Sequence, residues 1–196
     1  MSSNLRSNIT RNLQKVFWIY VTDNFVISRV SDFKTTEAVK KCGFIPIAQD
    51  NYFRVRDFRG EDRVSEYGGK IARNEIGFFA ECDGKMVGSI WATWNQTQAP
   101  TIARAHVRLM PNEALIHDIV TGESFRGMGV GPFMVGRISS ALLGEYGVSK
   151  IIVDVNVKNH ASLRMMEKAG LQAQLRVCSI SAFGTLAFEK VIRHGA

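Results

Sequence analysis

The sequence predicts an α/β (α+β) fold, with a mixed, mostly antiparallel central sheet and helices on both of its faces. Strand-like patterns dominate the chain up to residue 121. From residue 122 to residue 171 the pattern alternates between loop, helix, strand and helix, and two strand-like runs follow. This order is typical of a mixed sheet that carries helices on both sides.

The first 75 residues contain three interpretable segments. Residues 16–30 are rich in β-branched and aromatic side chains and are interrupted by Asp23-Asn24, which predicts a strand pair or one bent strand. Residues 32–42 have the pattern of a short helix. Residues 61–72 predict a helix interrupted by Gly68-Gly69, because glycine weakens a helix interior.

A hairpin is the clearest feature of the middle of the chain. Residues 76–82 and 86–94 are apolar runs joined by Asp83-Gly84, and Asp-Gly between two such runs is a strong hairpin signal. Residues 96–111 form a long connection with room for a strand. Residues 114–121 predict the next strand.

The last third predicts two helices between strands. Residues 132–146 have apolar side chains at helical spacing, with Gly147 as the stop. Residues 151–157 are an almost unbroken apolar run, as expected for a strand covered on both faces. Asn159 is placed to cap the second helix. The closing strands are predicted at 171–179 and 185–192.

Length and charge limit the possible functions. The chain has 196 residues, which favours a single domain over 1–196. The net charge of +7 suits an anionic partner, but the basic residues are mixed with acidic ones. Because no basic arm or nucleic-acid motif is present, we expect no nucleic acid as a partner.

The cysteines and apolar runs predict a location. The chain has an odd number of widely spaced cysteines: Cys42, Cys82 and Cys178. The sequence therefore suggests neither a disulfide framework nor a metal site, and we expect the thiols to be reduced. The longest apolar run near the start covers only residues 16–21, which is too short to span a bilayer. We therefore expect a cytoplasmic protein with no membrane span.

The strongest functional signal is the loop Arg126-Gly127-Met128-Gly129-Val130-Gly131 between a strand and a helix. Glycines let the backbone approach a ligand closely, and the amides of such a loop and of the following helix start can bind phosphate. A plain turn is the alternative. A dinucleotide-binding loop fits less well, because it requires an early βαβ unit and an acidic residue about 20 residues further on.

The loop and its surroundings resemble the GCN5-related N-acetyltransferase (GNAT) superfamily. Arg126, Gly129 and Gly131 match the family's Arg/Gln-x-x-Gly-x-Gly/Ala loop, and the strand 116–121 is similar to the family's fourth strand. The segment from Asn159 to Leu171 is similar to its second signature. The resemblance covers 76–171 and implies that residues 1–60 are an acceptor-specific elaboration.

The resemblance implies roles for named residues. Ile119, Val120 and Thr121 would contact the pantetheine arm of acetyl-CoA, in a slot between their strand and residues 151–157. The amides of Gly127, Met128, Gly129, Val130 and Gly131 would hold the pyrophosphate, with Arg126 in support. Asn159 would lie near the thioester, although it could also serve only as a helix cap.

Transfer to an amine requires a base, because an ammonium must lose a proton before it attacks. The candidates are Glu113, His117 and Asp118, and each could instead have a structural role. Glu113 and His117 share one face of a regular strand, and Asp118 points to the other. Met166 occupies the position where many family members carry a tyrosine acid, with Tyr67 and Tyr146 as possible substitutes.

The resulting hypothesis is an acetyl-CoA-dependent N-acetyltransferase that acts on a small-molecule or protein amine. The alternatives are the same fold with an acyl carrier protein as donor, and a non-catalytic module that binds or senses coenzyme A. The closing strands could also pair between two chains, which would give a homodimer.

Overall fold

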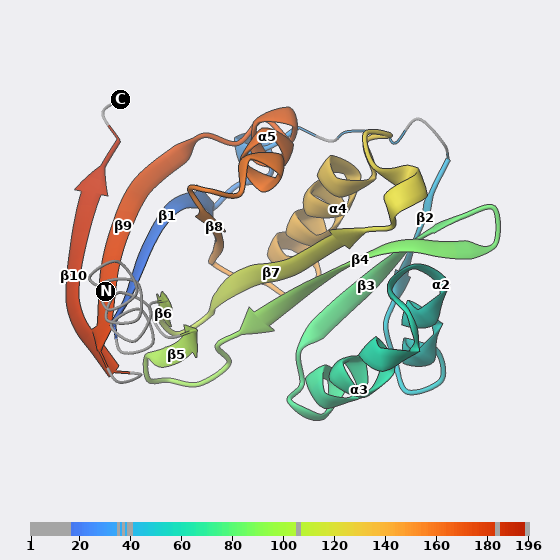
Figure 1. The fold of residues 1–196 in the computed structure, drawn as a ribbon, viewed down its shortest axis with the longest axis horizontal. Coiled ribbons are helices and arrows are strands. Elements are labelled where there is room, and N and C mark those ends of the chain that lie inside the picture. Colours follow the sequence, from blue (N-terminus) through green and yellow to red (C-terminus); the bar gives the residue numbers. More distant parts are fainter. Residues whose placement is uncertain are drawn as a thin grey trace, which may run out of the picture.

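The computed structural model describes residues 17–34, 36, 38, 41–104, 107–182 and 185–194. An eight-stranded sheet in the order β10-β9-β1-β8-β7-β4-β3-β2 forms the frame of the fold (Figure 1). Its neighbouring strands are antiparallel except for the central pair β7 and β8, which are parallel. The expected mixed, mostly antiparallel sheet is confirmed.

The strands of the large sheet are β1 (Phe17–Ile27), β2 (Gly43–Pro46), β3 (Ile76–Cys82), β4 (Lys85–Trp94), β7 (Glu113–Thr121), β8 (Lys150–Asn156), β9 (Ala173–Ala182) and β10 (Thr185–Arg193). A separate two-stranded sheet pairs β5 (Thr101–Arg104) with β6 (Val107–Leu109). The helices are α2 (Arg56–Arg59), α3 (Val64–Ala72), α4 (Val130–Gly144) and α5 (His160–Lys168).

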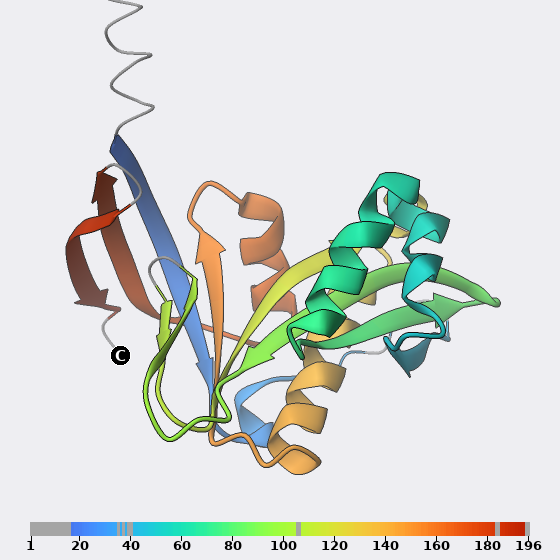
Figure 2. The ribbon, with the colours of Figure 1, turned by 90° about the horizontal axis from the view of Figure 1, so that it is seen from below.

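The helices cover both faces of the sheet, as Figure 2 shows for α3 and α4. On one face Val55 and Tyr67 pack against Phe79 and Trp91. On the other face α4 and α5 pack on a larger apolar cluster that includes Ile116 and the inward side chains of β8. Burial alternates regularly along β8: Ile151, Val153 and Val155 are buried, and the residues between them are half-buried. The expectation that this strand is covered on both faces is therefore wrong.

The first strand is continuous and shorter than the predicted range of 16–30. Residues 17–27 form one continuous strand, β1, whose register with β9 shifts between Asn24 and Phe25. The bent strand is therefore confirmed, and the strand pair is wrong. Because β1 lies between β8 and β9, both of its edges are paired, and this keeps it continuous through Asp23-Asn24.

The two early helix predictions have different outcomes. Helix α3 runs without a break through Gly68 and Gly69, so the predicted interruption is wrong. Gly68 packs against the Tyr52 ring, from which a β-carbon would lie 3.4 Å away. The predicted helix at 32–42 includes positions 35, 37, 39 and 40, which lie outside the described residues. The described residues from 33 to 42 are not helical.

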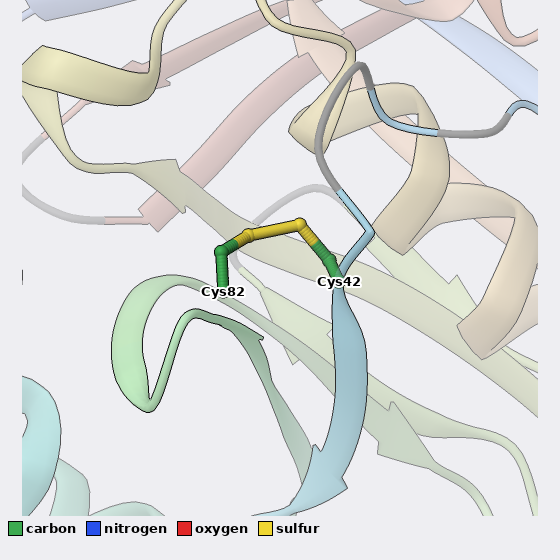
Figure 3. Close-up of a disulfide and its surroundings, with 2 residues drawn as sticks. All are labelled: Cys42 and Cys82. Carbon is green, nitrogen blue, oxygen red and sulfur yellow. A yellow bond between two sulfur atoms is a disulfide. The ribbon is translucent and has the colours of Figure 1, made fainter.

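A disulfide between Cys42 and Cys82 corrects the expectation of reduced thiols (Figure 3). The two residues are 40 apart in sequence, but β2 pairs with β3 so that Gly43 lies opposite Glu81. This pairing brings Cys42 beside Cys82, a proximity that sequence spacing alone does not reveal. The expectation of a cytoplasmic location therefore loses the support that it took from reduced thiols.

None of the helices in the described part of the chain is long and apolar enough to cross a membrane.

Candidate active site

The glycine-rich loop adopts a conformation that glycine favours. The backbone φ angles of Gly127 and Gly129 are 80° and 78°, in the left-handed region where a β-carbon is strained. Helix α4 starts directly after Gly129, and its first intrahelical bond runs from the Phe133 N–H to the Gly129 carbonyl. The N–H groups of Val130 and Gly131 therefore precede the helical ladder and can bind an anion.

The loop forms one wall of a cleft of about 610 Å³. The opposite wall comes from α5, and β7 contributes Ile119, Val120 and Thr121. All but one of the predicted donor-binding residues of β7 and the loop line this cleft, the exception being Met128. Arg126 lies at its rim with a mostly exposed side chain, 4.0 Å from Glu123.

Helix α5 adds two cations that the sequence analysis missed. Arg164 and Lys168 line the same cleft as Arg126. They are four residues apart on one helix, so they lie on one face of it. Helical spacing together with the adjacent glycine loop is the signal that points to them.

The sheet opens beside this cleft. Strands β7 and β8 pair from Glu113 opposite Lys150 to Ile116 opposite Val153, and no pairing follows beyond that point. A second cavity of about 300 Å³ occupies the opening and shares Ile119 and Ser162 with the cleft. The expected slot between the two strands is therefore present.

Asn159 lines the second cavity and also caps α5. Its side-chain oxygen accepts a hydrogen bond from the backbone N–H of Ser162 at 3.1 Å. The capping role is confirmed, and the position beside the opening allows a second role.

A β-bulge shapes β7 at the opening. Trp91 pairs with His117 and Ser89 pairs with Val120, so Asp118 and Ile119 together face Ile90. The φ angle of Asp118 is 44°, which is unusual for a residue other than glycine. A bulge re-aims side chains next to functional sites, and here it turns Asp118 toward α3.

Asp118 is held by two cations. Its carboxylate accepts hydrogen bonds from Lys70 and from Arg59, the latter at 3.0 and 3.1 Å. Burial of the Asp118 carboxyl raises its pKa, but the hydrogen bonds and charges of Lys70 and Arg59 outweigh burial and lower the pKa below its ordinary value. A carboxylate with a lowered pKa is a weak base.

The cations themselves are fixed by aromatic side chains. The Lys70 ammonium lies 5.1 Å from the ring centroids of both Tyr67 and Trp91, and its side chain is only 7% exposed. The Tyr67 hydroxyl is hydrogen-bonded to Ser89 at 2.5 Å and to Arg59 at 3.3 Å. The Tyr67 hydroxyl is therefore already hydrogen-bonded within this buried network next to Asp118.

His117 contacts a carboxylate that the sequence analysis missed. Its Nε2 atom lies 3.3 Å from Oε2 of Glu75 and 3.0 Å from the Thr93 hydroxyl. Glu75 directly precedes β3, on the far side of β4 from His117. No local sequence signal pairs residues 75 and 117, because only the strand order joins them.

A third cavity, of about 380 Å³, lies on the α3 side of the opening. It shares His117 and Asp118 with the cavity between β7 and β8. The remaining lining residues are Glu66, Lys70, Arg73, Glu75, Thr93 and Ala103. The cavity on the α3 side and the cavity between β7 and β8 therefore meet at His117. The cavity between β7 and β8 also continues into the glycine-loop cleft.

Glu113 does not join His117. Its carboxylate accepts the backbone N–H of Met110 at 3.0 Å and pairs with Lys150 at 2.5 Å, at the opposite end of β7. The shared strand face was correctly anticipated, but four residues along a strand separate the two side chains by about 13 Å. Glu113 stabilises the turn that leads into β7.

Met166 occupies the position of the expected tyrosine acid, and the structure shows where it lies relative to nearby tyrosines. Met166 is fully buried in the core and also borders the cavity between β7 and β8. Tyr146 packs on Trp94 and lines none of the cavities named above. Tyr20 of β1 does line the cavity with His117, and sequence reasoning missed it. Among the described residues, no group of three His, Cys, Asp or Glu side chains is arranged to hold a metal.

Solved structures of acetyltransferases have a similar fold. A GCN5-related N-acetyltransferase from Kribbella flavida superposes with a TM-score of 0.57 at 12% identity, over 89% of this chain and 62% of that one. A GNAT-family acetyltransferase from Colwellia psychrerythraea gives 0.58 at 14%, over 89% and 61%. AAC(6')-Iy in complex with the bisubstrate analogue CoA-S-monomethyl-acetylneamine gives 0.53 at 15%, over 68% and 92%.

The chain covers only part of many of these structures. It spans 22% of a fungal multi-domain GH3 β-N-acetylglucosaminidase with a glucosamine N-acetyltransferase region, and between 57% and 65% of the next three similar structures. No curated protein is significantly similar in sequence. The model of the acetyltransferase (GNAT) family matches residues 42–171, which is more than half of the chain. The chain therefore belongs to the GNAT acetyltransferase family, whose members transfer acyl groups from acyl-CoA.

Proposed function

We propose that the protein transfers the acetyl group of acetyl-CoA to a primary amine. The observation that carries this proposal is the opening of the sheet between β7 and β8. It joins the glycine-loop cleft to a charged pocket, and His117 lies at the junction. A donor and an acceptor that enter from opposite sides can meet there.

The donor side suits a pyrophosphate on an apolar arm. The loop amides and the start of α4 would bind the pyrophosphate, with Arg126, Arg164 and Lys168 as counter-charges. The pantetheine arm would lie along Ile119, Val120 and Thr121, where β7 has left β8. A thioester at the end of that arm would reach the cavity beside Asn159.

His117 is the proposed base. It takes a proton from the acceptor ammonium, and the neutral amine then attacks the thioester carbonyl carbon. A carbon–nitrogen bond forms, the carbon–sulfur bond breaks, and the second proton of the attacking nitrogen passes to the departing thiolate, so the products are the N-acetyl amine and free coenzyme A. The backbone N–H of the bulge at Ile119 is the proposed donor to the oxyanion.

The other two candidate bases have structural explanations. Asp118 is ion-paired to Lys70 and Arg59, and Glu113 is paired to Lys150 away from the opening. With Met166 in the usual place of the tyrosine, the thiolate would leave without that acid, which its low basicity allows. The proposal therefore assigns one base and no dedicated acid.

Calorimetric titration with acetyl-CoA, free coenzyme A and a long-chain acyl-CoA tests the donor side. Tight binding of the acetyl form and loss of that binding in Gly129→Val support the proposal. Folded protein that binds none of the three contradicts it. Salt-sensitive binding of an acyl carrier protein would then favour that donor, and binding without turnover on amines would favour a sensor role.

We also propose that β10 pairs with β10 of a second copy. The outer edge of β10 has no neighbour among the described strands, and Phe188, Val191 and Ile192 are all about half-exposed. Glu189 and Lys190 lie side by side between Phe188 and Val191, so antiparallel pairing can place opposite charges across the new edge. Light scattering of wild type and Val191→Lys tests this, and a wild-type monomer contradicts it.

A further inference from the structure

The pocket on the α3 side contains an unused hydrogen-bond acceptor. The side chain of Glu75 is 9% exposed, and its two oxygens differ in their contacts. Oε1 accepts hydrogen bonds from Nε and Nη2 of Arg73 at 2.9 and 2.8 Å. Oε2 is buried, accepts no hydrogen bond from any described residue and lies 3.3 Å from Nε2 of His117.

We propose that Oε2 of Glu75 binds the ammonium of the acceptor and that the acceptor is a small, hydrophilic primary amine. The assignment rests on the proposed function, and it adds the acceptor site and the substrate class. Glu75 holds the amine, and His117 beside it takes the proton.

The position of Glu75 is fixed by the end of α3. The N–H of Asn74 donates to the Ile71 carbonyl and the N–H of Glu75 donates to the Lys70 carbonyl, with Asn74 at a φ of 57°. This is the hydrogen-bond pattern of a Schellman motif, which fixes the two residues after a helix. The same helix end therefore fixes Lys70, which holds Asp118, and Glu75, which faces His117.

Two acceptor atoms that face each other require a proton between them. In the tautomer that carries its proton on Nδ1, Nε2 of His117 and Oε2 of Glu75 are both acceptors, and the hydroxyl hydrogen of Thr93 can rotate away from Nε2 when a ligand donates to it. An unpaired buried acceptor is costly, so this geometry favours a ligand that donates N–H bonds to both atoms. An ammonium does so, and its proton is then already beside the base.

The lining of the pocket defines the class of amine. Ala103 is the only apolar residue among the described residues that line it, whereas Glu66, Lys70, Arg73, Glu75, His117 and Asp118 are ionisable. The glycine-loop cleft has three cations and a larger apolar surface, with Ile119, Val120, Phe125, Val130 and Met165 in its walls. A volume of about 380 Å³ fits a compact molecule. Aromatic and long alkyl amines would bury apolar surface against charges, which is unfavourable.

The charged groups around His117 must be counted in any pH experiment. Those that line the two cavities that contain it are Tyr20, Glu66, Lys70, Arg73, Glu75, Asp118 and Asp154. Removal of the Glu75 charge is expected to lower the pKa of His117, because a carboxylate 3.3 Å away stabilises the imidazolium.

The test uses Glu75→Gln with Glu81→Gln as the matched control, since Glu75 directly precedes β3 and Glu81 lies near the far end of that strand. Two probes, 1,3-diaminopropane and phenethylamine, are titrated into the full chain saturated with free coenzyme A. The imidazole signals of His117 are followed by NMR. Loss of a charge-assisted hydrogen bond should weaken binding of 1,3-diaminopropane about 10- to 100-fold in Glu75→Gln. Binding to Glu81→Gln should equal that to wild type.

Each outcome decides the proposal. Diamine binding that depends on Glu75, at least tenfold tighter than phenethylamine binding and with a lower His117 pKa in Glu75→Gln, supports it. Equal binding by wild type and Glu75→Gln, or an unchanged His117 pKa, overturns it. If Glu75→Gln does not fold, Glu75→Asp replaces it, because the shorter side chain withdraws Oε2 and keeps the charge. Failure of acetyl-CoA to bind is measured separately and contradicts the proposed function, whereas the amine and NMR readouts still test Glu75.

Discussion

Replacement of Asp118 by asparagine distinguishes a structural carboxylate from a catalytic base. Asp118 compensates the charges of Lys70 and Arg59, and its side chain is 19% exposed. Asp118→Asn keeps the size of the side chain and leaves the Lys70 ammonium, only 7% exposed, with Glu66 as its remaining partner. Loss of one partner of a buried ion pair costs about 3–5 kcal/mol, and the partial exposure here favours the lower end.

Urea denaturation followed by circular dichroism measures this cost. With a slope of about 2–3 kcal/mol per molar urea, a loss of about 3 kcal/mol lowers the midpoint by about 1 M or more. Glu61→Gln is the control, since the Glu61 pair with Arg56 is exposed and its loss costs at most about 1 kcal/mol. An unchanged midpoint in Asp118→Asn together with a lost turnover would refute the structural role and restore Asp118 as the base.

We expect Asp118→Asn also to change how the stability of the protein depends on pH in acid. Because the folded-state pKa of Asp118 is lowered, its contribution is fully present above the unfolded-state pKa of about 3.9. That contribution is lost as the pH falls through the folded-state pKa. Wild type should therefore lose more stability than Asp118→Asn below about pH 4, and parallel curves for the two proteins would contradict the pairing.

Three further predictions concern the disulfide, the loop and the base. Replacement of both Cys42 and Cys82 by serine should cost about 4 kcal/mol of unfolding free energy, since the bond closes a loop of 40 residues, and an unchanged denaturation midpoint would contradict this. Gly129→Val should weaken acetyl-CoA binding, measured by calorimetry, at least tenfold, because the backbone φ of 78° at this position strains a branched residue. The control Gly144→Ala, which has open space around the added methyl group, should bind acetyl-CoA as tightly as wild type. His117→Gln should lower kcat about 10²- to 10⁴-fold at an unchanged acetyl-CoA Kd, and a full kcat would exclude His117 as the base.

Local chemistry in the sequence determined much of the donor side. Asp83-Gly84 set the hairpin, Asn159 capped α5, and the glycines from Gly127 to Gly131 marked the turn into α4. Each signal acts within a few residues, because turn geometry, capping and backbone freedom are local properties. The cleft beside that loop therefore lies where the sequence predicted it.

Only the tertiary structure decided the acceptor side. The contacts between Glu75 and His117, between Lys70 and Asp118, and between Cys42 and Cys82 join residues 40 or more positions apart. The order of the strands brings them together, and hydrophobic periodicity reports which face of a strand is buried but not which strand lies beside it. The sequence alone therefore determined the glycine-rich loop and the elements around it, whereas strand pairing decided which charges meet at His117.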